Sequence, residues 1–213
     1  MENLIRETIE YQNWGWNMAT VSFFATLFFT LWQGLSLLQQ NSTIRNKHSG
    51  EALSVSFFAY SGSYFFAFLV YGLTKHSIAM TFNGLLGIPY IPILFALYKY
   101  KGFESADWFA VLFFPLMVPT IILLEESGRD IFVLCGLFFI LIPLIGQTWG
   151  MYKTKNVGAV EPKFLKAFMA AGIFWFAYGL SGGGWIFVVF NPISFVVLGT
   201  ALTLHHRYNK TAS

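Results

Sequence analysis

The amino-acid sequence predicts an all-α, polytopic membrane protein whose seven transmembrane helices form two parallel three-helix repeats joined by a linker helix (3+1+3). Three observations predict this fold. The 213 residues are 56% hydrophobic and only 11% charged, whereas soluble domains carry about 25% charged residues. Apolar runs of about 20 residues recur, long enough for a helix to cross a hydrocarbon core of about 30 Å. A local sequence pattern also returns after a nearly constant interval.

The apolar runs are expected to be membrane-spanning helices. Tryptophans stand at several run ends, among them Trp14, Trp108 and Trp185, and indole rings favour the membrane interface. Taken in order, the expected spans are Trp14–Leu38, Ser54–Thr74, Ser77–Tyr98, Trp108–Leu124, Ile131–Tyr152, Phe164–Leu180 and Trp185–Leu204.

An internal repeat relates the first three spans to the last three. A Tyr-Gly-Leu triplet begins at Tyr71 and returns at Tyr178, 107 residues later, and Asn83 returns as Asn191 after 108 residues. Such a fixed offset is typical of a repeat. Three crossings reverse the direction of the chain, so a second copy in the same orientation needs one extra crossing, which the fourth span supplies. The expected units are a first triple-helix bundle at 1–103, the linker helix at 104–128 and a second bundle at 129–213.

Basic residues set the expected orientation. With the N-terminus outside, the inner side holds ten lysines and arginines and the outer side three. The positive-inside rule therefore favours an external N-terminus and a cytoplasmic C-terminus, and we expect the protein in the plasma membrane. The inner residues are Arg45, Lys47, Lys99, Lys101, Lys153, Lys155, Lys163, Lys166, Arg207 and Lys210, and the outer ones Arg6, Lys75 and Arg129.

The motifs resemble those of the SWEET (MtN3/saliva) sugar-transporter family, within the wider PQ-loop group, with this chain as a divergent member. The family has seven helices in a 3+1+3 plan, and the resemblance covers nearly the whole chain after Tyr11. Its PQ-loop pattern places a Pro-Gln dipeptide at the end of the first helix of each repeat. Here Gln33 and Gln147 match the glutamines, while both prolines are absent. Of the four prolines usual near the family's inner gate, only Pro162 remains.

The resemblance implies a solute site between the repeats. Asn83 and Asn191 match asparagines that face the central cavity in the family's third and seventh helices. Phe68 and Trp175 match pocket-lining positions, each three residues before a Tyr-Gly-Leu tyrosine. The expected gate residues are Tyr71 and Tyr178 on the outer side, with Gln33, Gln147 and Pro162.

Each of these residues also has a structural interpretation. An intramembrane asparagine can hydrogen-bond a neighbouring helix, Trp175 can be a packing residue, and the two tyrosines can anchor helix ends at the interface. Two asparagines at repeat-equivalent positions favour ligand contact, because an amide both donates and accepts hydrogen bonds.

The expected function is facilitative, uncoupled uniport of a small neutral polar solute, above all a sugar, by alternating access. The central parts of the repeat spans contain no Asp, Glu, Lys, Arg or His, whereas ion-coupled carriers need an intramembrane ionisable group. The alternatives are a PQ-loop-type or nicotinamide-riboside-type carrier of an amino acid or vitamin, and a non-transporting receptor on the same fold.

Other classes of function have little support in the sequence. The spans hold no nucleophile–base pair, carboxylate dyad or metal-ligand spacing, and Cys135 is the single cysteine. We therefore expect no enzymatic activity, no catalytic or metal-binding residues and no cofactor. The expected partners are the solute and the lipid bilayer, without nucleic acid, and homo-oligomer formation is left open.

Overall fold

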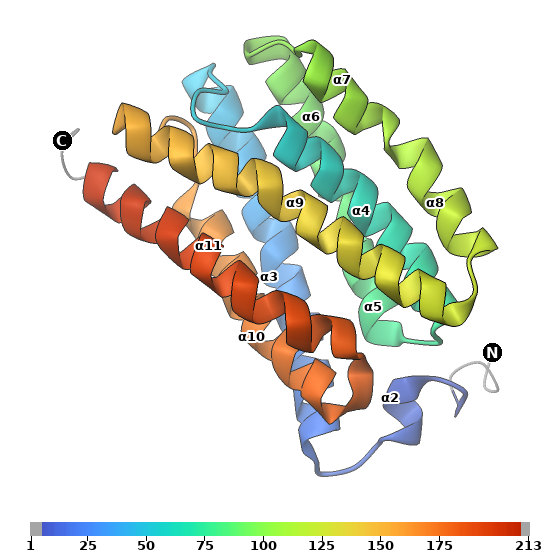
Figure 1. Ribbon diagram of the computed structural model, residues 1–213. Coiled ribbons are helices and arrows are strands. Elements are labelled where there is room, and N and C mark those ends of the chain that lie inside the picture. The colour runs from blue at the N-terminus through green and yellow to red at the C-terminus, as the bar shows by residue number, and fades with distance from the viewer. Residues whose placement is uncertain (1–5, 210–213) are drawn as a thin grey trace.

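The structure is a computed structural model that describes residues 6–209, apart from the side chains at positions 114 and 115. It is a bundle of long helices, and the described residues form no β-strand (Figure 1). The helices are α2 (Ile9–Gln12), α3 (Met18–Lys47), α4 (Val55–Thr74), α5 (Ile78–Gly84), α6 (Gly87–Tyr100), α7 (Ser105–Leu112), α8 (Phe114–Leu123), α9 (Glu126–Thr154), α10 (Pro162–Tyr178), the π-helical turn η1 (Gly179–Gly183) and α11 (Trp185–Asn209).

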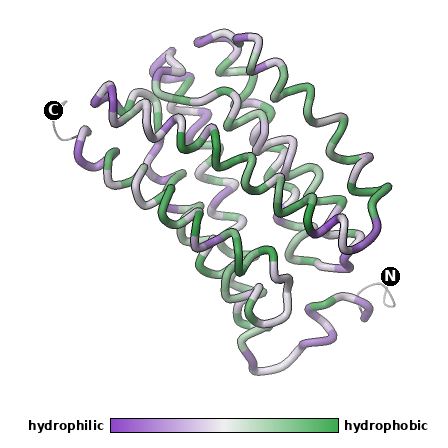
Figure 2. The backbone as a smooth tube through the Cα atoms, in the orientation of Figure 1, coloured by the Kyte–Doolittle hydropathy of each residue, from purple (hydrophilic) through white to green (hydrophobic). Residues whose placement is uncertain are grey.

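Seven of these segments, among residues 6–209, are long and apolar enough to cross a membrane: α3, α4, α5–α6, α7–α8, α9, α10–η1 and α11. Figure 2 shows α9 hydrophobic along most of its length and hydrophilic at both ends. Large apolar side chains such as Phe109, Leu123 and Val196 are exposed on the outside of the bundle, where lipid can solvate them. The predicted seven-helix, all-α membrane fold is confirmed.

Short polar residues explain where several helices begin. The side chains of Asn17, Ser54 and Ser77 each accept a hydrogen bond from a backbone N–H in the first turn of α3, α4 and α5, which satisfies a group that the helix itself leaves unpaired. The first helices of the two repeats also end alike. His48 after α3 and Lys155 after α9 both adopt the left-handed conformation, with φ of 48° and 53°. These two residues are 107 positions apart.

The packing order is the same in the two sets of three helices. In the first set, α5 and α6 pack against both α3 and α4, and in the second, α11 packs against both α9 and α10. The sets meet along two interfaces, α3 with α10 and α4 with α9. Both interfaces pair a first helix with a second helix of the other set, as a two-fold relation requires. The linker helices α7 and α8 lie against α4 (Figure 1).

Two glycines bring the backbones of α4 and α5 into direct contact. A Cβ atom at Gly72 would lie 2.3 Å from the backbone nitrogen of Thr81, and one at Gly84 would lie 2.4 Å from the Cα atom of Leu69. Small residues allow this close approach of membrane helices. The first set of three helices is therefore closely packed beside the interface with the second.

Candidate functional site

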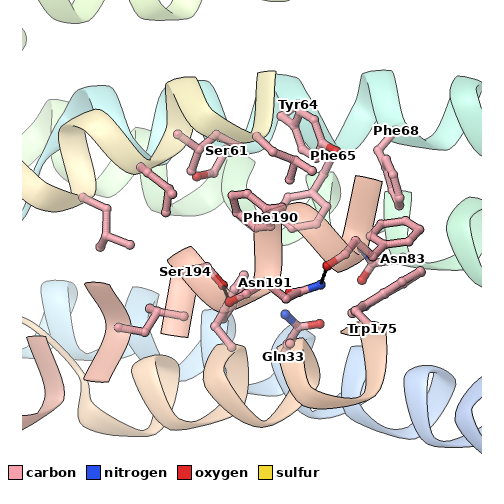
Figure 3. A pocket seen from close by; sticks show the side chains of 18 of the residues that line it. Gln33, Ser61, Tyr64, Phe65, Phe68, Asn83, Trp175, Phe190, Asn191 and Ser194 are labelled. Atoms are coloured by element: carbon pink, nitrogen blue, oxygen red, sulfur yellow. Dashed lines mark hydrogen bonds between the residues drawn. The ribbon is translucent and has the colours of Figure 1, made fainter. Parts of the chain in front are cut away.

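A buried cavity of about 110 Å³ lies between the two sets of helices (Figure 3). Among residues 6–209, no Asp, Glu, Lys, Arg or His side chain lines it. Its lining consists of Gln33, Phe57, Ser61, Tyr64, Phe65, Phe68, Asn83, Leu137, Ile140, Leu141, Leu144, Phe164, Phe168, Gly172, Trp175, Phe187, Phe190, Asn191, Ser194 and Leu198. Of the residues predicted to bind solute or to form gates, five line this cavity: Gln33, Phe68, Asn83, Trp175 and Asn191.

The two predicted asparagines line the cavity, and in each side-chain amide one of the two polar atoms already has a hydrogen bond within the protein. The Thr30 hydroxyl donates to Oδ1 of Asn83 at 3.0 Å. Nδ2 of Asn191 donates to the Phe187 carbonyl, one turn earlier in α11, at 2.8 Å (Figure 3). The Nδ2 of Asn83 and the Oδ1 of Asn191 have no hydrogen bond within the described part of the chain. One asparagine therefore offers the cavity a donor and the other an acceptor.

Repeat-equivalent aromatic rings meet at both ends of the cavity. Phe68 and Trp175 contact each other edge to face, with ring centroids 6.0 Å apart. Phe57 and Phe164, also 107 positions apart, contact each other at 6.0 Å. The second pair was not singled out in the sequence, although the constant offset could have found it.

Beyond the Phe68–Trp175 pair, each Tyr-Gly-Leu tyrosine donates a hydrogen bond to a carboxylate. The Tyr178 hydroxyl donates to Glu10 at 2.8 Å, and the Tyr71 hydroxyl donates to Asp130 at 2.8 Å. Glu10 precedes the first helix of the first repeat, and Asp130 lies near the start of the first helix of the second. Each tyrosine therefore reaches across to the other repeat. We call these two contacts the tyrosine–carboxylate closure.

Glu10 is a buried carboxylate with four hydrogen bonds, and sequence reasoning missed it. It is 6% exposed. Besides the bond from Tyr178, it accepts bonds from the Ser77 hydroxyl at 2.7 Å and from the backbone N–H groups of Ile78 and Ala79 at 3.0 Å. It thus pairs backbone N–H groups at the start of α5, where a negative charge is also favoured by the helix dipole. The residue lies before the first apolar run, and no sequence pattern marked it.

An ion-pair cluster surrounds the second carboxylate. Lys75 Nζ lies 2.9 Å from Asp130 and 2.9 Å from Glu126. Burial lowers the pKa of Lys75, but hydrogen bonds to Asp130 and Glu126 raise it more, so the net pKa is above its ordinary value. Lys75 therefore stays charged at neutral pH. The stability that its ion pairs contribute is lost only at alkaline pH, above about 10.4.

At the opposite end of the cavity, a glutamine from each first helix bonds the backbone of the other repeat. Oε1 of Gln40 accepts from the N–H of Glu161, and Oε1 of Gln147 accepts from the N–H of Ser54, both at 2.9 Å. Both acceptor glutamines and both donor residues are 107 positions apart. Nε2 of Gln40 also donates to the Ala159 carbonyl at 2.8 Å, whereas Nε2 of Gln147 is buried without a partner within residues 6–209. We call these contacts the glutamine closure.

The contacts change the pairing of the predicted gate glutamines. Gln147 lies in the glutamine closure, but the residue equivalent to it there is Gln40, while Gln33 lines the cavity. Pro162 begins α10, directly after the Glu161 N–H that Gln40 binds.

Two open grooves lie outside the closures. One, of about 1060 Å³, is lined by Tyr71, Lys75 and Asp130 among others. The other, of about 390 Å³, is lined by Ser54, Lys101 and Gln147 among others. The cavity with the asparagines therefore lies between two grooves, separated from each by one closure.

Comparison with known proteins assigns the fold. No protein-family model matches the sequence, and no curated protein matches it. A solved structure described as a eukaryotic SWEET transporter at 3.7 Å resolution matches the chain with a TM-score of 0.63 and 13% sequence identity, covering 91% of this chain and 97% of the other. The fold is therefore SWEET-like, as the sequence motifs predicted, and the low identity agrees with a divergent sequence.

Proposed function

We propose that this integral membrane protein, which has a SWEET-like fold, is a facilitative transporter of a small neutral polar solute, a sugar, by alternating access. The observation that carries the proposal is the cavity between the two sets of helices, with an amide donor from Asn83 and an amide acceptor from Asn191. Amides suit hydroxyl groups, and the surrounding rings suit the apolar faces of a sugar. In this proposal Phe68 and Trp175 hold those faces.

The two closures support alternating access as the mechanism. We propose that opening the tyrosine–carboxylate closure exposes the cavity to one side of the membrane, and opening the glutamine closure exposes it to the other. The moving units are the bundles 1–103 and 129–213, with 104–128 as their linker. The distribution of basic residues supports an orientation with the tyrosine–carboxylate closure outside, with the N-terminus, and the glutamine closure with Pro162 inside.

Transport is proposed to be uncoupled, because the cavity lining carries no charged side chain within the described part of the chain. Glu10 and Asp130 bond the tyrosines instead of facing the cavity. A membrane potential or a pH gradient should therefore leave the solute at equal concentration on both sides at equilibrium. Accumulation of a neutral solute against its gradient would contradict uncoupled transport.

The experiment is uptake into proteoliposomes of D-glucose, D-galactose, D-xylose and sucrose, with glycine and nicotinamide riboside for the alternative carriers. Asn83→Ala and Asn191→Ala should each lower affinity about 5- to 150-fold, because a polar group left unpaired in a dry site costs about 1–3 kcal/mol. Thermal stability in detergent should fall less, since interhelical polar contacts average about 0.6 kcal/mol. Asn46→Ala, on the exposed end of α3, is the control.

Two outcomes would contradict the proposal. Variants that lose stability but keep wild-type uptake per folded molecule would make both asparagines packing residues. Uptake of glycine or nicotinamide riboside without uptake of any sugar would replace the sugar by an amino acid or vitamin, with the fold unchanged.

A further inference from the structure

We infer that Gln33 and Tyr64 bind the transported solute directly and select for a solute with hydroxyl groups along one edge. This inference rests on the proposed function. Both residues line the cavity, and they are buried, at 4% and 3% exposure. Figure 3 shows Gln33 rising from one side of the cavity and Tyr64 on the other, with the asparagines between them.

Both side chains carry polar atoms without a partner. Oε1 of Gln33 and the hydroxyl of Tyr64 are buried and make no hydrogen bond to any other residue from 6 to 209. Native proteins pair the large majority of such atoms, and leaving one unpaired in a dry interior is unfavourable. A solute hydroxyl that donates to Gln33 and another that bonds the Tyr64 oxygen would satisfy both.

The rest of the Tyr64 side chain is fixed in place by packing. Its ring stacks on Phe68, with centroids 5.6 Å apart, and it also lies against Gly136 of α9, where an added Cβ would be 3.2 Å away. The hydroxyl is therefore held at a defined position by the ring. A fixed, unpaired donor–acceptor group in a cavity is suited to selecting among solutes by the position of a hydroxyl.

At two pairs of repeat-equivalent positions, the cavity lining is polar in the first repeat and apolar in the second. The residues 107 positions after Gln33 and Ser61 are Ile140 and Phe168, and all four line the cavity. At these positions α3 and α4 therefore present polar side chains, whereas α9 and α10 present apolar ones. A ring with a hydroxylated edge and a C–H face matches this difference, with its edge toward Gln33 and Tyr64.

The cavity volume sets a size limit. At about 110 Å³, the cavity is smaller than the roughly 300–1,000 Å³ of pockets for drug-sized ligands. We therefore infer a solute with a single ring, so that a monosaccharide is transported and sucrose is not.

The test uses Tyr64→Phe and Gln33→Leu in the full chain. The probe is D-glucose, or D-galactose or D-xylose if wild type transports that sugar instead, together with the monodeoxy analogues of the same sugar. Each variant should bind the parent sugar about 5- to 150-fold more weakly. One deoxy analogue lacks the hydroxyl that the substituted residue binds. The variant and the wild type should bind that analogue with equal affinity.

Matched controls separate solute contact from a structural role. Tyr60→Phe, one turn earlier in α4 with its ring against Phe113, does not line the cavity. Gln39→Leu changes an exposed glutamine of α3. Both controls should keep wild-type affinity. The melting temperature of ligand-free Tyr64→Phe should not fall, because the substitution removes a hydroxyl group that has no hydrogen-bond partner among residues 6–209.

Each outcome decides between the two proposals. If the asparagine variants lose affinity but Tyr64→Phe and Gln33→Leu bind every analogue as wild type does, the direct-contact inference is wrong and the proposed function stands. A lower melting temperature with unchanged affinity would also overturn the direct contact and leave the proposed function standing. Sucrose uptake at the monosaccharide rate would overturn the size limit. If wild type transports no sugar in the panel, the proposed function itself fails.

Discussion

The two ends of the cavity are closed by the same exchange of partners but by different chemistry. At one end, a tyrosine on the second helix of each repeat bonds a carboxylate near the first helix of the other. At the opposite end, a glutamine on the first helix of each repeat bonds a backbone N–H before the second helix of the other. The two-fold relation between the repeats thus determines which segments pair. The individual residues determine how strong the hydrogen bonds between them are.

The strengths are expected to differ. Hydrogen bonds to charged groups contribute about 1.5–3 kcal/mol each and neutral ones about 0.5–1.5. The tyrosine–carboxylate closure should therefore be the harder one to open.

Three sets of substitutions test this difference, and each uses the same measurement of opening. The exposed Cys135 is first replaced by serine, and Ser61→Cys then places a single thiol in the cavity. An impermeant thiol reagent is added from either side of the membrane, and the rate of labelling is measured.

Glu10→Ala should have the largest effect. It removes the acceptor for Ser77, Ile78, Ala79 and Tyr178 together. We expect a loss of about 2–4 kcal/mol in the free energy of unfolding, because buried donors lose a charged acceptor and α5 loses a cap. Thermal unfolding in detergent measures the loss, and the thiol should become reactive from the side of α2. Glu7→Ala, at an exposed position nearby, is the control. Wild-type stability and labelling in Glu10→Ala would contradict a role for this carboxylate in the closure.

Tyr178→Phe and Tyr71→Phe should have intermediate effects. Each removes a single bond to a carboxylate and keeps the ring, so opening at the α2 end should become more frequent by about 10- to 150-fold, the equivalent of about 1.5–3 kcal/mol. Tyr71→Phe should have the smaller effect, because Lys75 remains paired with Asp130. The rate of thiol labelling from each side measures this. Equal labelling from both sides would mean that the tyrosines do not close one end in particular.

Gln40→Leu and Gln147→Leu should have the smallest effects, and unequal ones. Gln40 makes two hydrogen bonds to the other repeat, whereas Gln147 makes one and leaves its Nε2 buried and unpaired. The Gln40 substitution should destabilise the closed state relative to the open state by about 1–2 kcal/mol, and the Gln147 substitution by about 1 kcal/mol or less. Thiol labelling should rise from the side opposite α2, more for Gln40→Leu. A larger rise for Gln147→Leu would refute this assignment of strengths.

Most of the fold could be predicted from the sequence. The apolar runs located all seven spans, since a membrane helix must be apolar for about 20 residues. Their ends were predicted less well. The expected first span ended at Leu38, whereas α3 continues to Lys47, because hydropathy detects the part of a helix within the membrane and not the polar turns beyond it.

Less of the candidate site could be predicted. The constant offset pointed to Asn83, Asn191, Phe68 and Trp175, all of which line the cavity. The Pro-Gln motif suggested Gln33 as the counterpart of Gln147, and only the hydrogen bonds identified Gln40 instead. Glu10 could not be predicted, because its burial depends on how the short α2 packs against the start of α5.

The close contact of α4 and α5 has a mechanical consequence. With Gly72 and Gly84 placing one backbone against the other, any sliding between these helices would force main-chain atoms into overlap, so α4 and α5 should move as one unit. The second repeat has Pro192 at the position equivalent to Gly84, and its α10–α11 connection contains Gly182 and Gly184 with φ of 101° and 130°. We therefore expect any deformation of the bundle to fall more on the second repeat than on α4 and α5.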